Sequence, residues 1–73
     1  ALEVLRRGSE GAQVKTLQRL LKQLGYKDEG GRVLSIDGRF GPATDYAVRK
    51  FQKNRLNGSD GIVGAKTWAK LLK

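Results

Sequence analysis

Apolar residues in the first third of the chain recur every three or four positions, with basic residues between them. This spacing is typical of an amphipathic helix that buries one face. Ser9 is a suitable N-cap, Glu10 would place an acid in the first turn, and Gly25 is a suitable stop signal. We therefore predict a first helix over about residues 10–24. The apolar positions on its buried face are Val14, Leu17, Leu20, Leu21 and Leu24.

Two further segments show helical spacing. Pro42 suits the first turn of a second helix, which would follow Gly41 at or near its cap and end around Asn54 or Arg55. A third helix is predicted over about residues 65–72. The apolar residues expected to face inward are Ala43, Ala47, Val48 and Phe51 in the second helix and Trp68, Leu71 and Leu72 in the third. The basic residues expected to point outward are Arg49, Lys50, Lys53, Lys66, Lys70 and Lys73.

The region between the first and second helices is polar and contains the pair Gly30-Gly31, which indicates a turn. The short apolar run over residues 33–36 is expected to pair briefly with Tyr26 as a small hairpin. The whole pattern predicts an all-α fold, a compact three-helix bundle that occupies residues 1–73 as one domain. Its expected core includes Leu17, Leu20, Leu21, Phe40, Phe51, Trp68 and Leu71.

An eight-residue segment occurs twice in the chain. Residues 37–44 read DGRFGPAT, and residues 60–67 read DGIVGAKT. A weaker third copy, carried by Gly8, Gly11 and Val14, precedes the first helix. An Asp-Gly pair tolerates a positive φ, and each copy is followed by a helical pattern. The repeat is therefore predicted to be a turn that leads into a helix.

The 73 residues include 15 Lys and Arg against 7 Asp and Glu, a formal net charge of +8. This charge favours a polyanionic partner such as nucleic acid, a membrane surface or the bacterial wall, although it would also simply keep a small domain soluble. No apolar run approaches the ~20 residues that span a bilayer, so membrane insertion is not expected. Residues 1–5 are too short for a signal peptide, so we expect the export signal to lie outside this chain.

The chain contains no His and no Cys. This excludes disulfides, catalytic triads built on these residues, and zinc sites that use them as ligands. Only carboxylates remain as catalytic groups. Asp37 and Asp60 each precede a Gly in a predicted turn, where an Asp side chain usually accepts hydrogen bonds from nearby backbone N–H groups. We therefore expect no catalysis, no metal and no cofactor in this chain.

The repeated segments also contain the candidate ligand contacts. Asp37, Asp60 and Thr44 are suited to ordering the turns, but the same turns could present hydroxyl and N–H groups to a sugar or a peptide. Arg39 has no evident packing role and could pair with a carboxylate. Tyr46 lies off the apolar stripe of the second helix, so its ring could offer a platform for the face of a sugar. Arg39 and Tyr46 are expected to flank the first repeat.

Ordered motifs run along nearly the whole chain, from about Leu5 to Leu72. They are Gly-Ser-x-Gly, Leu-Gln-x-x-Leu, the first repeat, Phe-Gln and the second repeat. This ordered set resembles the small peptidoglycan-binding domains appended to bacterial and phage cell-wall hydrolases. Two departures are visible. The stretch between Gly25 and Asp37 is longer than is usual, and Leu56-Asn57 stands where relatives commonly show Gly-Leu.

The resemblance implies a three-helix fold and a non-catalytic module that binds peptidoglycan. Such a module would tether a linked amidase, carboxypeptidase or muramidase to the wall. It implies recognition at the first repeat and its surroundings, and the candidate ligand-binding residues are Asp37, Gly38, Arg39, Thr44, Tyr46 and Asp60. Anionic wall polymers are a further expected partner. We expect a monomer that acts outside the cell, at the bacterial wall.

Two other functions stay open at this stage. A basic helical DNA-binding domain would suit the charge, but the second and third helices lack a face with Arg, Asn and Gln at base-contacting spacing. Nucleic acid is therefore not the expected partner. A protein-interaction module such as a regulatory prodomain also resembles the family, but no Cys is present to ligate a partner's zinc.

Overall fold

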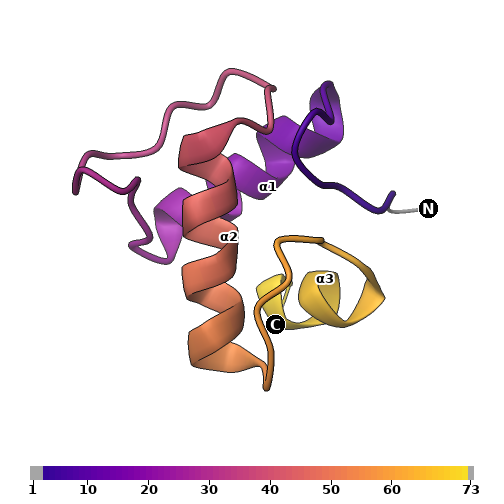
Figure 1. Cartoon of the computed structure of the whole chain (residues 1–73). Coiled ribbons are helices and arrows are strands. Elements are labelled where there is room, and N and C mark those ends of the chain that lie inside the picture. The colour runs from indigo at the N-terminus through magenta and orange to yellow at the C-terminus, as the bar shows by residue number, and fades with distance from the viewer. Residues whose placement is uncertain (1–2, 73) are drawn as a thin grey trace.

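The computed structural model describes residues 3–72 and contains three helices in this range. Helix α1 spans Ala12–Gln23, α2 spans Pro42–Arg55 and α3 spans Ala65–Leu71. Figure 1 shows α2 crossing in front of α1, with α3 beside the lower half of α2 and the N-terminal segment above α3. The predicted all-α three-helix bundle is confirmed. The other described residues form loops joined by isolated bridges.

Each helix begins directly after a glycine, and no side chain caps any of the three helix starts. The N-cap residues are Gly11, Gly41 and Gly64. They are the second glycines of the three repeat copies, and the prediction for Gly41 is confirmed. The repeat therefore sets the residue at which each helix starts.

Ser9 does not cap α1, contrary to the prediction. Its hydroxyl accepts a hydrogen bond from the Arg6 N–H at 3.1 Å, so it orders the turn before the helix. Helix α1 consequently starts at Ala12 rather than at residue 10. Glu10 lies outside the first helical turn and forms an isolated bridge with Arg39.

The N-terminal segment pairs with the loops that precede α2 and α3. Leu5 and Val63 exchange two backbone hydrogen bonds of 3.1 and 2.7 Å. The Gly8 N–H donates to the Phe40 carbonyl at 3.0 Å, and the Phe40 N–H donates to the Ser9 carbonyl at 2.9 Å. The backbone of residues 5–9 therefore holds both repeat segments in place.

The turn between α1 and α2 differs by one residue from its prediction. Val33 bridges to Lys27 rather than to Tyr26. The Tyr26 ring instead packs edge-on against the Phe51 ring, with ring centroids 5.5 Å apart and planes at 78°. The backbone N–H of Tyr26 already donates to the Leu21 carbonyl at 3.0 Å, so the next residue, Lys27, makes the bridge.

The core lies where the helices, the N-terminal segment and the repeat loops meet. All but one of the predicted core residues are at most 4% exposed, and Leu20 is partly buried. Leu24 and Leu72, both expected to face inward, are 45% and 56% exposed. Each is the C-cap residue of its helix, beyond the last helical position, so the helical spacing no longer directs its side chain toward the core.

A buried glutamine in α1 binds the first repeat. Gln18 is 1% exposed, and its Nε2 donates to Asp37 Oδ1 at 2.9 Å, to the Arg39 carbonyl at 3.0 Å and to Thr44 Oγ1 at 3.0 Å. Its Oε1 accepts a hydrogen bond from the Gly38 N–H at 3.0 Å. We call this set of contacts the first glutamine cluster.

A buried glutamine in α2 binds the second repeat in the same way. Gln52 is 2% exposed, and its Nε2 donates to Asp60 Oδ1 at 3.0 Å, to the Ile62 carbonyl at 2.8 Å and to Thr67 Oγ1 at 3.2 Å. Its Oε1 accepts from the Gly61 N–H at 3.0 Å. This is the second glutamine cluster, and the two clusters use equivalent residues of the two repeats.

A side chain at the first glycine of either repeat would be strained and would crowd neighbouring side chains. Both glycines have a positive φ, 77° at Gly38 and 75° at Gly61. A Cβ at Gly61 would lie 2.6 Å from Asp45 Oδ1 and 2.9 Å from Arg49 Nε, and one at Gly38 would lie 3.2 Å from Lys15 Cε. Arg49, expected to point freely outward, therefore covers the second repeat and pairs with Asp45 at 3.1 Å.

The hydrogen bonds of the clusters favour the ionised form of both aspartates. The Arg39 N–H and the Gln18 amide donate to Asp37 and lower the pKa of its carboxyl below the usual 3.8. The Ile62 N–H is the largest cause of the lowered pKa of Asp60, and desolvation opposes it. Both side chains therefore carry a negative charge at neutral pH.

Replacing Trp68 should destabilise the fold strongly. Trp68 is 3% exposed, and its Nε1–H donates to the Glu3 carbonyl at 2.8 Å. Trp68→Ala should lower the free energy of unfolding by about 3–5 kcal/mol, as large aromatic truncations in cores do. Trp68→Phe keeps most of the ring and should cost clearly less. Urea denaturation followed by circular dichroism measures both variants, and a near-zero cost for Trp68→Ala would contradict the assigned core role.

Removing the amide of Gln18 should also destabilise the fold. In Gln18→Ala the Gly38 N–H and the Thr44 hydroxyl lose a partner inside the protein, and a buried unsatisfied group costs about 1–3 kcal/mol. We expect the free energy of unfolding to fall by roughly 2–4 kcal/mol. Gln23→Ala makes the same chemical change at an exposed site on α1 and should cost within about 0.5 kcal/mol. Equal costs for the two variants would refute the importance of the first cluster.

The lowered pKa values predict a loss of stability in acid. The folded-state pKa of Asp37 and Asp60 lies below the unfolded value of about 3.8. The ionised carboxylates therefore stabilise the fold fully above about pH 3.8, and this stabilisation is lost as the pH falls through the folded-state pKa values. Asp37→Asn with Asp60→Asn should therefore be less stable at neutral pH and lose less on acidification. Denaturation midpoints at neutral pH and well below 3.8 measure this. If the parent and the variant lost the same amount of stability on acidification, the two carboxylates would be excluded as the cause of the acid sensitivity.

Candidate functional site

The structure separates the candidate ligand contacts into buried and exposed groups. Gly38 is buried and Thr44 is 3% exposed, so both lie inside the first glutamine cluster and can only position its neighbours. Asp37 and Asp60 are exposed, but Oδ1 of each already accepts hydrogen bonds within its repeat. Only the second carboxylate oxygen of each remains for a ligand.

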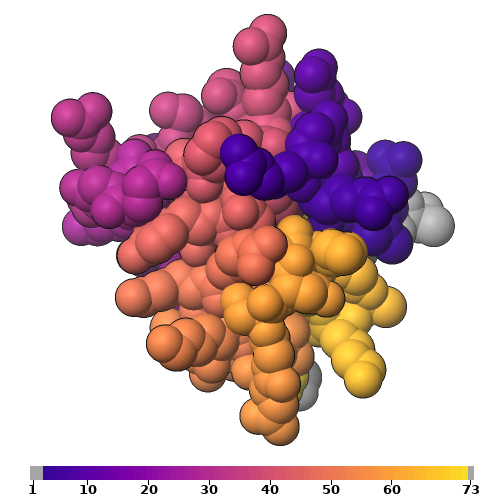
Figure 2. All heavy atoms as spheres, in the orientation of Figure 1, coloured from indigo at the N-terminus to yellow at the C-terminus, as the bar shows by residue number. Residues whose placement is uncertain are grey.

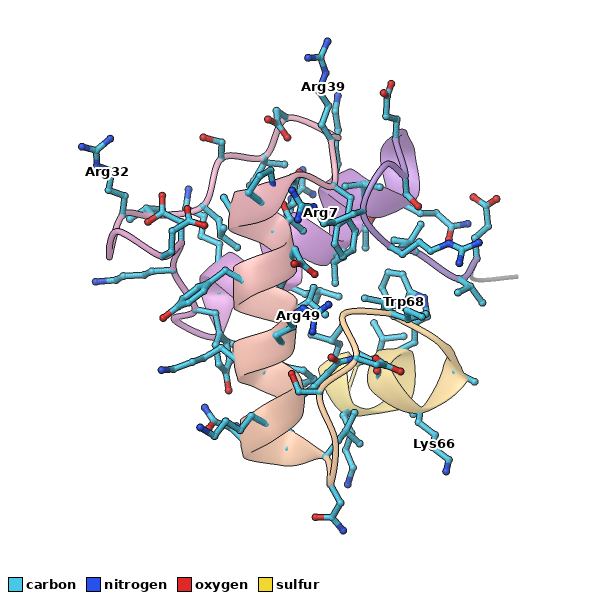
Figure 3. All side chains as sticks on the ribbon, in the orientation of Figure 1. Arg7, Arg32, Arg39, Arg49, Lys66 and Trp68 are labelled. Carbon is cyan, nitrogen blue, oxygen red and sulfur yellow. The ribbon has the colours of Figure 1, made fainter. Side chains whose placement is uncertain are left out.

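Arg39 stands at the edge of a polar hollow of about 290 Å³. We call it the first hollow. Its walls are formed by Asp28, Ser35, Asp37, Arg39, Pro42 and Ala43, over a floor made by Gln18 and Thr44. The first glutamine cluster therefore forms the base of this hollow. The guanidinium of Arg39 has no hydrogen-bond partner among residues 3–72, and Figure 3 shows it pointing away from the body of the protein.

Tyr46 lines a neighbouring hollow of about 300 Å³, which we call the Tyr46 hollow. Its side chains come from the loop after α1 and from one face of α2. They are Tyr26, Lys27, Asp28, Tyr46, Lys50 and Asn54. Tyr46 is 39% exposed, so much of its ring remains accessible. Figure 2 shows this loop, in magenta, lying along the left side of α2.

Asp28 lines both hollows, so they meet at this residue. Arg39 and Tyr46, predicted to flank one turn, therefore lie in adjoining hollows on one continuous surface along α2. Asp28 is itself fixed, because its Oδ1 accepts hydrogen bonds from the Gly30 N–H at 2.9 Å and the Arg32 N–H at 2.8 Å. We call the joined hollows the α2 surface.

Several residues of this site were not identified from the sequence. Asp28 and Ser35 line the α2 surface although neither was proposed as a contact, and Lys50, which the sequence places on the outward basic face of the second helix, lines it as well. The glutamines were seen only as parts of the Leu-Gln and Phe-Gln motifs. The signal for them was the helical spacing, since Gln18 and Gln52 lie four positions after the buried Val14 and Val48, on the inward face of each helix.

The described residues offer no site for a metal ion. Among residues 3–72 there is no group of three or more Asp and Glu side chains placed to hold one. In the same range, no helix has the length and apolar character needed to cross a membrane. The α2 surface offers hydrogen-bonding groups, single charges and two aromatic rings, Tyr26 and Tyr46.

Comparison with known families and proteins agrees with this architecture. The family described as "Putative peptidoglycan binding domain" matches residues 10–71. The chain is 43% identical over 67 residues to the zinc D-Ala-D-Ala carboxypeptidase of Streptomyces albus G, covering 92% of this chain and 25% of that protein. It is 41% identical over 63 residues to the N-acetylmuramoyl-L-alanine amidase CwlL of Bacillus licheniformis, covering 85% of this chain and 18% of that protein. The chain thus spans a quarter or less of the length of these two relatives.

Solved structures share the whole fold. The crystal structure of the SleB N-terminal domain superposes with a TM-score of 0.84 at 38% identity and covers 99% of this chain and 92% of that one. The structure of the Burkholderia AP3 phage endolysin gives a TM-score of 0.80 at 43% identity, covering 94% of this chain and 24% of that one. Because the family match extends over residues 10–71 and the shared fold extends over nearly all of the chain, this protein belongs to the putative peptidoglycan binding domain family.

Proposed function

We propose that this domain binds peptidoglycan through the α2 surface and holds a linked cell-wall hydrolase at its substrate. The observation that carries the proposal is the family match, together with an open, polar surface on which the Arg39 guanidinium has no hydrogen-bond partner within residues 3–72 and the Tyr46 ring is accessible. The relatives named above are a carboxypeptidase and an amidase, and the matching region is a small part of each. Such an arrangement suits a targeting module beside a catalytic domain.

Binding without catalysis fits the chemistry of the chain. There is no His or Cys to act as a nucleophile or a base. Asp37 and Asp60 are held by hydrogen bonds within their repeats, and their lowered pKa values keep them ionised, so neither is suited to act as a general acid at neutral pH. The catalytic groups would belong to the linked enzyme.

The α2 surface offers contacts for both parts of peptidoglycan. The Arg39 guanidinium can form a paired hydrogen bond with a carboxylate of a stem peptide. The accessible Tyr46 ring can pack against the apolar face of a sugar, with Lys50 and Asn54 beside it for polar groups. Because the two hollows meet at Asp28, one extended strand could contact both.

The net charge of +8 adds a second, less specific attraction. It should draw the domain toward the carboxylates of the wall and toward anionic wall polymers, and salt should weaken this part of the binding. The charge would equally suit nucleic acid, but nothing in the comparisons favours that partner. The site of action would be the bacterial wall. There even a weak module keeps a linked enzyme concentrated near an insoluble substrate.

Sedimentation with purified peptidoglycan sacculi tests the α2 surface. The domain should co-sediment, and part of the binding should persist at high salt. Arg39→Ala with Tyr46→Ala should remove most of this salt-resistant part, since both contacts to the polymer are lost. Both side chains are exposed and lack internal hydrogen bonds within residues 3–72, so the free energy of unfolding should change by no more than about 1 kcal/mol.

Lys70→Ala is the matched control, because it removes one positive charge from an exposed position on α3 that lines none of the hollows. It should reduce only the salt-sensitive part of the binding. If Lys70→Ala harmed the salt-resistant part as much as the Arg39 and Tyr46 change, the α2 surface would not be the binding site. Failure of the parent domain to sediment at all would refute the proposed function.

A further inference from the structure

The second repeat forms a hollow of its own, between the end of α2 and the start of α3. It has a volume of about 400 Å³, and we call it the second hollow. Its lining includes Gln52, Leu56, Asn57, Asp60, Lys66 and Thr67. Three of these residues, Gln52, Asp60 and Thr67, are members of the second glutamine cluster, so the cluster forms the base of this hollow.

The base of the second hollow is equivalent to the base of the first. In each, a buried glutamine amide binds an aspartate carboxylate and a threonine hydroxyl of one repeat, over distances between 2.9 and 3.2 Å. In each, Oδ1 of the aspartate is used internally and the other oxygen has no partner within residues 3–72. The duplication of the sequence has therefore produced two hollows with the same polar base.

The walls supply comparable chemistry from different positions. In the first hollow the cation is Arg39, the third residue of its repeat. In the second hollow that position is Ile62, and the cation is instead Lys66, at the position that Ala43 occupies in the first repeat. Each hollow is therefore lined by one aspartate and one basic side chain, which come from different positions of the two repeats.

The remaining walls of the second hollow are suited to an amide-bearing sugar. Neither the Asn57 amide nor the Lys66 ammonium has a hydrogen-bond or ion-pair partner in the described part of the chain. Leu56 is half-buried and adds an apolar wall next to them. An apolar wall, a free amide and a free ammonium match the ring face, the N-acetyl group and the peptide carboxylate of one disaccharide-peptide unit.

We propose that the second hollow is a second binding site for the same polymer, so that one domain binds two disaccharide-peptide units. This inference rests on the proposed function. A ligand with a single recognised group would need only one hollow, whereas peptidoglycan presents the same unit many times. Figure 3 shows Arg39 and Lys66 pointing away from the body in opposite directions, at opposite ends of the view. The two sites therefore engage separate units rather than one.

Two sites on one rigid domain make attachment to the wall bivalent. Once one hollow is occupied, the other faces a high local concentration of further units, so the apparent affinity for intact wall can exceed that for one unit by about 10²–10⁴-fold. The domain should therefore bind a single soluble unit weakly and the insoluble wall tightly.

Titration of the ¹⁵N-labelled domain with a soluble disaccharide-tetrapeptide, observed by NMR, tests this directly. Two groups of amide signals should shift. One group includes Arg39 and Tyr46, and the other includes Asn57 and Lys66. Asn57→Ala with Lys66→Ala should abolish the second group of shifts and change the affinity of the first group by no more than about twofold, since the sites are separate. Binding to sacculi should fall by about tenfold or more, because bivalence is lost.

Lys70→Ala is again the control, since it removes one charge from α3 outside the hollow. It should keep both groups of shifts. The amide signals of Leu5 and Val63, which pair across the fold, report whether each variant is still folded. The second site is overturned if only the Arg39 group shifts in the parent domain and the Asn57/Lys66 variant binds sacculi as the parent does, and the proposed function then stands. If neither group shifts and the parent domain does not sediment with sacculi, both proposals fail.

Discussion

The side-chain amide of a buried glutamine is the contact on which the rest of this structure depends. Each repeat loop turns its backbone groups and a threonine hydroxyl inward, where water cannot satisfy them. Gln18 and Gln52 each provide two donors and an acceptor in a fixed geometry, which is what such a loop needs. No buried side-chain nitrogen or oxygen within residues 3–72 is left without a partner.

This constraint links stability to the proposed function. The loops that the glutamines fix carry Arg39 and Asp60 on their outer side, and they end at the glycines from which α2 and α3 start. The base of the first hollow and of the second hollow is therefore part of the core. The side chains that form their walls are at least partly exposed, and they differ between the two hollows. A domain of 73 residues without disulfides can in this way present preorganised binding surfaces. The duplication gives the small fold two hollows with the same polar base.

Helical spacing and glycine positions are local signals, so the three helices and the cap at Gly41 could be predicted from the sequence. Contacts between distant segments could not. Ser9 has the right chemistry for a cap, but its hydroxyl is used by the turn before α1. The sequence alone does not show whether the Gln18 amide is exposed to solvent or binds a loop that lies far along the chain. For the site, Arg39 and Tyr46 could be selected as free side chains, but their placement in two hollows joined at Asp28 depends on how the loop after α1 folds.

Amide hydrogen exchange at Gly38 and Gly61 tests most directly whether the glutamines hold the repeat loops as firmly as the core. Both N–H groups lie in loops outside any helix, and each donates to a glutamine Oε1. Both amides should exchange only through global unfolding, with the same opening free energy as the helical amides of Leu17 and Phe51. Rapid exchange of the two glycine amides, while the helical amides stay protected, would contradict this role of the glutamines.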